Sequence, residues 1–142
     1  MKNTSQPDTQ SSEKITFLCN KLGRDKGLEG FKAQDIIPKY KILTGDEWRT
    51  ELQRKLIEEA SEVHEAKNVE EIAAELADVL EVINGLCKAY NISTQELEQI
   101  RQKKHEERGG FEQGLYIETL EMEANNPRVK HFRASPDRYP EV

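Results

Sequence analysis

Four carboxylates in two helix-length stretches have the spacing of a metal site. Glu59 and Glu62 are three residues apart, and Glu75 and Asp78 repeat that spacing further along the chain. Residues three apart on an α-helix are neighbours on its surface, so each pair would present two carboxylates together. Four anions in one patch would repel one another unless a cation neutralised them. We therefore expect these four residues to bind a metal ion.

The apolar residues around these carboxylates place them partly inside hydrophobic stripes. At 3.6 residues per turn, Glu59 falls about 20° from Leu52 in the apolar arc of its stretch, and Glu75 falls inside the arc of the second. Glu62 and Asp78 fall at the borders of those arcs. In the same projection Glu58 points toward solvent.

An all-oxygen ligand set of high negative charge suits a hard divalent cation, and Mg²⁺ fits best because it usually meets substrate phosphates. Lysine or arginine side chains that pair with the carboxylates are the structural alternative. A di-iron bundle would need Glu-x-x-His on paired helices. His64 and His105 do not have that spacing, so magnesium and phosphate chemistry remain the prediction.

Three helices must position these residues. Hydrophobic periodicity predicts them over about residues 47–66, 69–90 and 93–108. If the first two form an antiparallel hairpin, their four carboxylates converge, since each pair lies at a similar height above the turn. The signals for the helix ends are Thr44 or Asp46, Asn68 with Glu71, Ser93 with Glu96, and Gly109 with Gly110.

The flanking segments carry weaker signals. Residues 1–13 are polar and predict a disordered tail, followed by a single all-α domain over residues 14–142. Within residues 14–45 a short helix and a short strand near residues 40–43 are possible interpretations. The tail from Tyr116 contains three prolines and predicts irregular structure.

Composition excludes some functional classes. The 142 residues are 34% charged and carry a net charge of −6, without the basic excess of a nucleic-acid or membrane-surface binder. No apolar run reaches the roughly 20 residues of a membrane span, and the N-terminus has no signal-peptide pattern. Cys19 and Cys87 lack paired spacing and predict buried thiols in a reducing compartment, which is typical of a cytoplasmic protein.

The expected helices are too few to cover their own apolar faces. The apolar arc of the helix over residues 69–90 is wider than one neighbouring helix can cover. We therefore expect a homodimer, or a higher homo-oligomer, that completes the bundle.

The acidic pattern also resembles a known superfamily. Glu-x-x-Glu followed by Glu-x-x-Asp on neighbouring helices is similar to the all-α nucleoside triphosphate (NTP) pyrophosphohydrolases, the MazG-like and phosphoribosyl-ATP pyrophosphohydrolase-like proteins. The chain resembles their house-cleaning NTP pyrophosphatase branch over roughly residues 15–140. The motifs are KLGRDKG (21–27), KLIEEASEV (55–63), ELADVLEVI (75–83) and KKHEERGGF (103–111).

This resemblance implies hydrolysis of a standard or nonstandard NTP between its α and β phosphates, with Mg²⁺, in an oligomeric helical bundle. It implies metal ligands at Glu59, Glu62, Glu75 and Asp78, with Glu59 and Glu62 central to catalysis. Glu58 is the further catalytic candidate, as the residue that orients a water molecule.

The resemblance also implies that basic side chains hold the phosphates. The candidates are Lys21, Arg24, Lys26, Lys103 and Arg108. The stretch between the two acidic motifs, residues 63–74, is short and leaves substrate selectivity open. Phosphoribosyl-ATP or dUTP pyrophosphohydrolysis is the alternative activity, and a catalytically silent helical regulatory or binding module is the alternative without chemistry.

Overall fold

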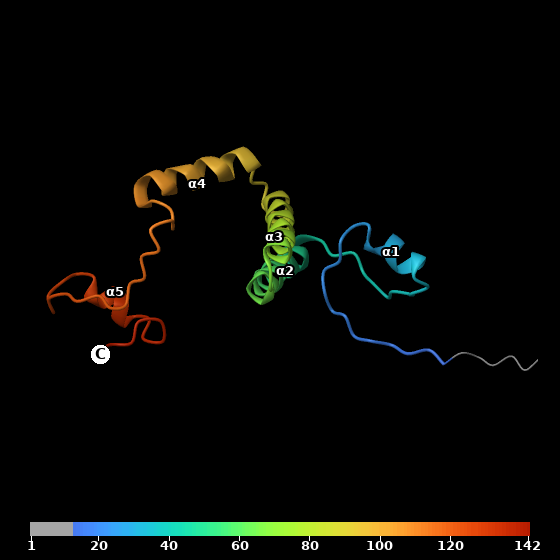
Figure 1. The fold of residues 1–142 in the computed structure, drawn as a ribbon, viewed down its shortest axis with the longest axis horizontal. Coiled ribbons are helices and arrows are strands. Elements are labelled where there is room, and N and C mark those ends of the chain that lie inside the picture. Colours follow the sequence, from blue (N-terminus) through green and yellow to red (C-terminus); the bar gives the residue numbers. More distant parts are fainter. Residues whose placement is uncertain (1–12) are drawn as a thin grey trace, which may run out of the picture. The chain divides into compact units, whose positions relative to one another are not determined.

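The computed structural model describes residues 13–142, and its regular secondary structure over that range is entirely helical. Figure 1 shows the five helices of the described residues: α1 (Gly27–Ala33), α2 (Gly45–Glu65), α3 (Val69–Ala89), α4 (Thr94–Arg108) and α5 (Val129–Arg133). The predicted all-α class is therefore confirmed. The possible strand near residues 40–43 is wrong, because that stretch is irregular. Except for Glu13, the predicted disordered tail lies outside the described residues.

The chain divides into two compact units, Met1–Gln99 and Ile100–Val142, with the boundary inside α4. The first unit contains α1, α2 and α3, and the second contains most of α4 and all of α5. A single domain over residues 14–142 stays a prediction. Among the described helices, none combines the length and the apolarity needed to cross a membrane.

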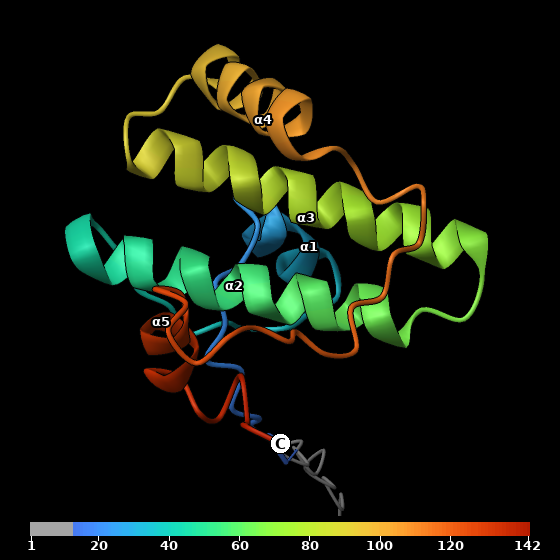
Figure 2. The same ribbon diagram turned by 90° about the vertical axis from the view of Figure 1, so that its left-hand side faces the viewer.

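In the first unit α2 and α3 pack side by side as an antiparallel hairpin, as Figure 2 shows. Leu52 of α2 and Val82 and Ala89 of α3 form the buried centre of their contact. Gly85 allows the two helices to come close, since an added Cβ would lie 3.0 Å from Leu52 Cδ2. Trp48 also packs against this core, as the first turn of an amphipathic helix permits.

The turn between α2 and α3 is held by side chains that cap α3. Asn68 Oδ1 accepts a hydrogen bond of 2.8 Å from the Glu71 N–H, which satisfies one free donor of the first turn. The Glu71 carboxylate accepts from Asn68 Nδ2 at 2.9 Å and from the Lys67 N–H at 2.8 Å. The capping pattern at this helix start is thus present, and it limits how the two helices enter the turn.

The ends of the other helices follow local signals as well. Ser93 Oγ accepts a hydrogen bond of 3.0 Å from the Glu96 N–H at the start of α4. Gly109, at φ +78°, ends that helix in the left-handed region that glycine tolerates. Thr44 is the N-cap residue of α2, but its side chain makes no capping hydrogen bond, and the helix starts at Gly45 rather than at 47.

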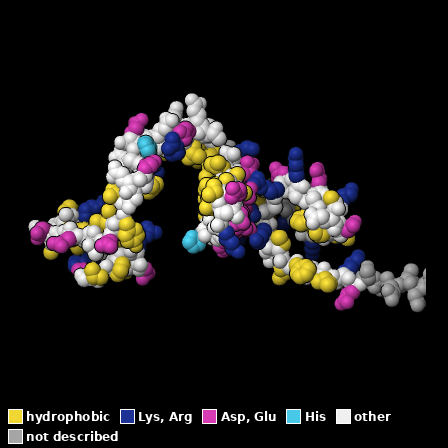
Figure 3. All heavy atoms as spheres, viewed as in Figure 1, with side chains coloured by type: hydrophobic (Ala, Val, Ile, Leu, Met, Phe, Trp, Pro, Cys, Tyr) yellow, Lys and Arg dark blue, Asp and Glu magenta, His cyan; other side chains and the backbone are white. Residues whose placement is uncertain are grey.

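Part of the apolar surface of α3 remains uncovered in the monomer. Val69, Ile72, Leu76 and Leu80 recur at helical spacing and are all exposed, Leu80 at 62%. In Figure 3 hydrophobic side chains gather on one side of the α2–α3 hairpin, and acidic side chains next to basic ones gather on the other. We call Val69, Ile72, Leu76 and Leu80 the α3 stripe.

The second unit holds a small aromatic cluster around α5. The Phe132 ring lies 5.0 Å from the Tyr139 ring in an edge-to-face arrangement, and the Arg128 guanidinium lies 5.7 Å from the Phe132 centroid. Arg133 makes two hydrogen bonds to the Glu141 carboxylate, of 2.6 and 2.9 Å. The segment from residue 116 onward, expected to be irregular throughout, therefore contains one short helix held by local contacts.

The two cysteines differ in burial. Cys87 is buried in α3, as its apolar surroundings predicted. The same prediction is wrong for Cys19, which is exposed in the irregular segment before α1. An apolar sequence neighbourhood indicates burial only where a packed element covers it, and no helix contains Cys19.

Candidate metal centre

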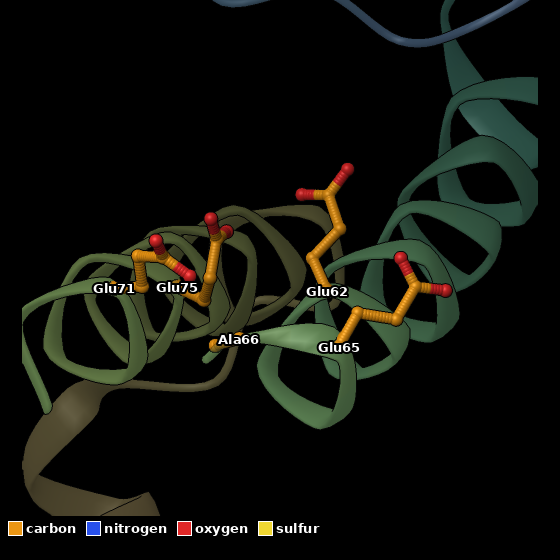
Figure 4. Close-up of a pocket in the computed structure, with 5 residues that line it drawn as sticks. All are labelled: Glu62, Glu65, Ala66, Glu71 and Glu75. Atoms are coloured by element: carbon orange, nitrogen blue, oxygen red, sulfur yellow. The ribbon is translucent and has the colours of Figure 1, made fainter. Parts of the chain in front are cut away.

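The hairpin brings three of the four predicted carboxylates together. Glu59 and Glu62 of α2 and Glu75 of α3 each offer one carboxylate oxygen, and these three oxygens lie within 4.8 Å of one another. Figure 4 shows Glu62 and Glu75 projecting to the same side of the two helices. Glu62 and Glu75 also line a cavity of about 310 Å³, together with Glu65, Ala66 and Glu71. Hence α2 and α3 build an acidic, solvent-accessible site near their turn.

Glu59 is the most confined member of this group. Its side chain is only 6% exposed, in agreement with the predicted position inside the apolar stripe. Its Oε1 lies 2.9 Å from Lys55 Nζ, whereas its Oε2 is buried without a hydrogen-bond partner. A buried acceptor without a partner is costly, and a charged one more so. A cation held by these three carboxylates would neutralise that charge, so the donor set fits a hard divalent metal ion.

Glu62 responds to the same crowding. Two ionised carboxylates cannot hydrogen-bond to each other, but a proton on Glu62 would give Glu59 a donor. The pKa of Glu62 is raised above its ordinary value, chiefly by that hydrogen bond. Repulsion from Glu59, partial burial and repulsion from Glu75 raise it further, in that order of size. The group therefore binds a proton more readily than an isolated glutamate does, and a metal ion would compete for the same position.

Glu58 faces basic side chains rather than the three-carboxylate group. Lys21 Nζ lies 2.8 Å from Glu58 Oε1, and Lys55 Nζ lies 3.3 Å from the same oxygen. The hydrogen bond from Lys21 lowers the pKa of Glu58, partial burial opposes it, and Lys55 lowers it further. Glu58 is therefore ionised at neutral pH. Glu58 was predicted on the solvent side of its helix, and its side chain is 25% exposed there because Lys21 and Lys55 pair with it.

Asp78 does not join the other three carboxylates. The metal-binding geometry that Glu59, Glu62 and Glu75 satisfy does not include it. Instead its Oδ1 pairs with the Arg24 guanidinium, which comes from the irregular segment before α1. The expectation that all four carboxylates converge is therefore corrected: three converge, and an arginine distant in sequence binds the fourth.

The predicted phosphate-binding residues fall into two groups. Lys21 and Arg24 lie at the acidic edges of α2 and α3 through their ion pairs, and Lys26 is exposed at the N-cap of α1. Lys103 and Arg108 are exposed residues of α4 in the second unit, and Lys103 lies 3.9 Å from Glu107. Phosphate binding by Lys103 and Arg108 stays a prediction.

Lys55 was missed by the sequence reasoning. Its side chain is 19% exposed, and its ammonium contacts both Glu58 and Glu59. Burial lowers the pKa of Lys55, but hydrogen bonds to Glu59 and Glu58 outweigh this and raise it, so the side chain stays charged. A signal was available, because a lysine three and four residues before two glutamates shares their helix face.

The comparison with known families agrees with this helix pair. Residues 40–105 match the family model of phosphoribosyl-ATP pyrophosphohydrolase, and this segment contains α2, α3 and most of α4. No curated protein and no solved structure is significantly similar to the chain.

Proposed function

We propose that the chain is a Mg²⁺-dependent nucleoside triphosphate pyrophosphohydrolase of the all-α superfamily, and the match of residues 40–105 to the phosphoribosyl-ATP pyrophosphohydrolase family model supports this. The reaction is cleavage between the α and β phosphates, with a nucleoside monophosphate and pyrophosphate as products. The observation that carries the proposal is Glu59. Its carboxylate is buried with one oxygen unpartnered and is grouped with two more carboxylates, an arrangement that destabilises the metal-free fold. A role in binding a cation explains this arrangement better than a role in stabilising the fold does.

The acidic residues have distinct roles in this proposal. Glu59, Glu62 and Glu75 would hold the metal ion, and Asp78 would become a fourth ligand on leaving its pair with Arg24. Bound Mg²⁺ would offset the charge of the triphosphate and of the pyrophosphate that leaves. Glu58 is ionised and keeps free acceptor positions, so it orients the attacking water.

The basic residues bind the substrate in this proposal. Lys21, Arg24 and Lys26 lie in one short segment of the first unit, and Lys21 and Arg24 contact the acidic residues already. They would hold phosphate groups of the substrate, and Lys103 and Arg108 of the second unit are further candidates for phosphate binding. Phosphoryl transfer depends mainly on such positioning and charge stabilisation.

The test is pyrophosphate release from a panel of standard and nonstandard NTPs with and without Mg²⁺. We expect pyrophosphate and monophosphate only with the metal. Glu59→Gln and Asp78→Asn should each lower turnover at least about 10²-fold with unchanged helical circular dichroism. Glu81→Gln is the matched control, because Glu81 is an exposed residue of α3 outside the acidic group. Release of orthophosphate alone, or turnover without metal, contradicts the proposal.

The family match favours one second candidate. Phosphoribosyl-ATP carries the same triphosphate, and the matched family is named for its hydrolysis. The same panel should therefore include phosphoribosyl-ATP and dUTP. A chain that releases pyrophosphate from none of these compounds would instead be a silent helical binding module.

We also propose that the chain acts as a homodimer. The exposed α3 stripe repeats the pattern of a helix with two apolar neighbours, and α2 supplies only one of them. A second copy offers an identical stripe, so a two-fold interface would bury both at once.

A further inference from the structure

One short loop contacts the acidic edges of both helices of the hairpin. Residues 21–26, which we call the basic loop, precede α1. Lys21 of this loop pairs with Glu58 on α2, and Arg24 pairs with Asp78 on α3. The basic loop thus bridges the two helices that carry the three-carboxylate group.

The pair between Arg24 and Asp78 has a direct consequence for metal binding. While Asp78 Oδ1 binds the guanidinium, that oxygen cannot also bind a metal ion, and Asp78 lies outside the three-carboxylate group. The two side chains are 57% and 41% exposed. Exposed ion pairs are weak and exchange their partners readily. A phosphate group of a triphosphate is a stronger partner for arginine, because it offers a fork of charged oxygens.

We propose that Arg24 couples phosphate binding to completion of the metal site, an inference that rests on the proposed function. Without nucleotide, Arg24 keeps Asp78 away from Glu59, Glu62 and Glu75. When a triphosphate binds, its phosphate takes the guanidinium, and Asp78 becomes free to act as the fourth ligand. Metal and triphosphate consequently strengthen each other's binding, by the same factor in both directions. Arg24 is in this sense a positioning residue for Asp78.

A double-mutant cycle without nucleotide tests the first half of the proposal, that Arg24 keeps Asp78 from acting as a metal ligand. The affinity for Mn²⁺ is measured by paramagnetic resonance of the free ion. We expect Arg24→Gln to bind Mn²⁺ about five-fold more tightly than wild type, because the competitor for Asp78 is gone. Asp78→Asn should have little effect in the wild-type background but should cancel the gain in the Arg24→Gln background.

The control for general electrostatics is Lys26→Gln, which removes one positive charge from the same loop. It should change the Mn²⁺ affinity much less than Arg24→Gln does. An equal gain in both variants would show a charge effect only and overturn the inference. So would an Arg24→Gln variant with unchanged or weaker affinity, or an Asp78→Asn variant that loses as much affinity in the wild-type background as in the Arg24→Gln background.

The second half of the proposal, that a phosphate group takes the Arg24 guanidinium from Asp78, is tested by binding of an α,β-methylene NTP analogue without metal. Arg24→Gln should weaken its binding, whereas Asp78→Asn should strengthen it by releasing the guanidinium. Glu75→Gln is the matched control, since it removes a carboxylate that has no ion pair with Arg24. An equal gain in Asp78→Asn and Glu75→Gln would contradict the exchange. These arms need no turnover: an inactive chain that shows the cycle refutes only the proposed function, and an active one without it refutes only the coupling.

Discussion

Lys55→Met offers a sharp test of the energetics of the acidic site. Lys55 is mostly buried and lies 2.9 Å from Glu59, whose other oxygen has no partner. Methionine retains the apolar length of the side chain but removes the charge and the hydrogen bonds. Without a metal ion, the buried Glu59 carboxylate then loses its compensating cation, while Glu58 keeps Lys21.

The expected cost follows from the burial of the pair. Removal of one partner of a buried ion pair typically destabilises a protein by about 3–5 kcal/mol. Lys55 is one-fifth exposed and the carboxylate can take up a proton, so we expect a loss of about 2–3 kcal/mol in the free energy of unfolding. For a chain of this size, that corresponds to a Tm lower by roughly 6–10 °C.

The measurement is urea denaturation at neutral pH with a chelator present. The matched control is Lys103→Met, because Lys103 is 76% exposed and lies 3.9 Å from its partner Glu107. Such an exposed pair contributes little, so we expect no measurable loss of stability from this variant. A similar loss in both variants would mean that the lost stability does not come from the pair with the buried Glu59 carboxylate.

The double variant Lys55→Met/Glu59→Gln separates charge from packing. It should be more stable than Lys55→Met, since no unpaired buried charge remains. Mg²⁺ should raise the Tm of Lys55→Met more than that of wild type, because the metal ion replaces the missing cation. The reasoning is refuted if Lys55→Met is as stable as wild type without metal, or if the second substitution brings no recovery.

Three further predictions concern pH, capping and assembly. Because the pKa of Glu62 is raised in the folded state, the protonated side chain stabilises the metal-free fold below pH 4.5, the ordinary pKa of glutamate. This stabilisation is lost as the pH rises through the folded-state pKa, so Glu62→Gln should make the Tm depend less on pH over that range. The pKa of Glu58 is lowered in the folded state, so its ionised form stabilises the fold above pH 4.5, and Glu58→Gln should remove this stability. Asn68→Ala should cost about 1 kcal/mol in urea denaturation because α3 loses its cap, whereas full stability would make the cap irrelevant. Leu80→Glu should convert the proposed dimer to monomer in gel filtration, and an unchanged elution volume would exclude the α3 stripe as its interface.

Local signals predicted the helices of the described chain well. Asn68 with Glu71 and Ser93 with Glu96 cap the helices they were expected to start, since a cap involves only residues a few positions apart. The five-residue helix α5 was missed because it is too short to show a period. The position of Glu59 inside the apolar stripe was also predictable, because the helical repeat alone decides which face a residue occupies.

The sequence by itself determined that α2 and α3 carry paired carboxylates, and that a short turn would bring acidic side chains of the two helices together. Only the tertiary structure decided which cations those acidic residues meet. Arg24 and Asp78 are 54 positions apart, and Lys21 and Glu58 are 37 apart. No helical repeat relates residues across such distances, because their meeting depends on how an irregular loop crosses the hairpin. For that reason the sequence predicted four converging carboxylates, whereas the fold brings together three and pairs the fourth with an arginine.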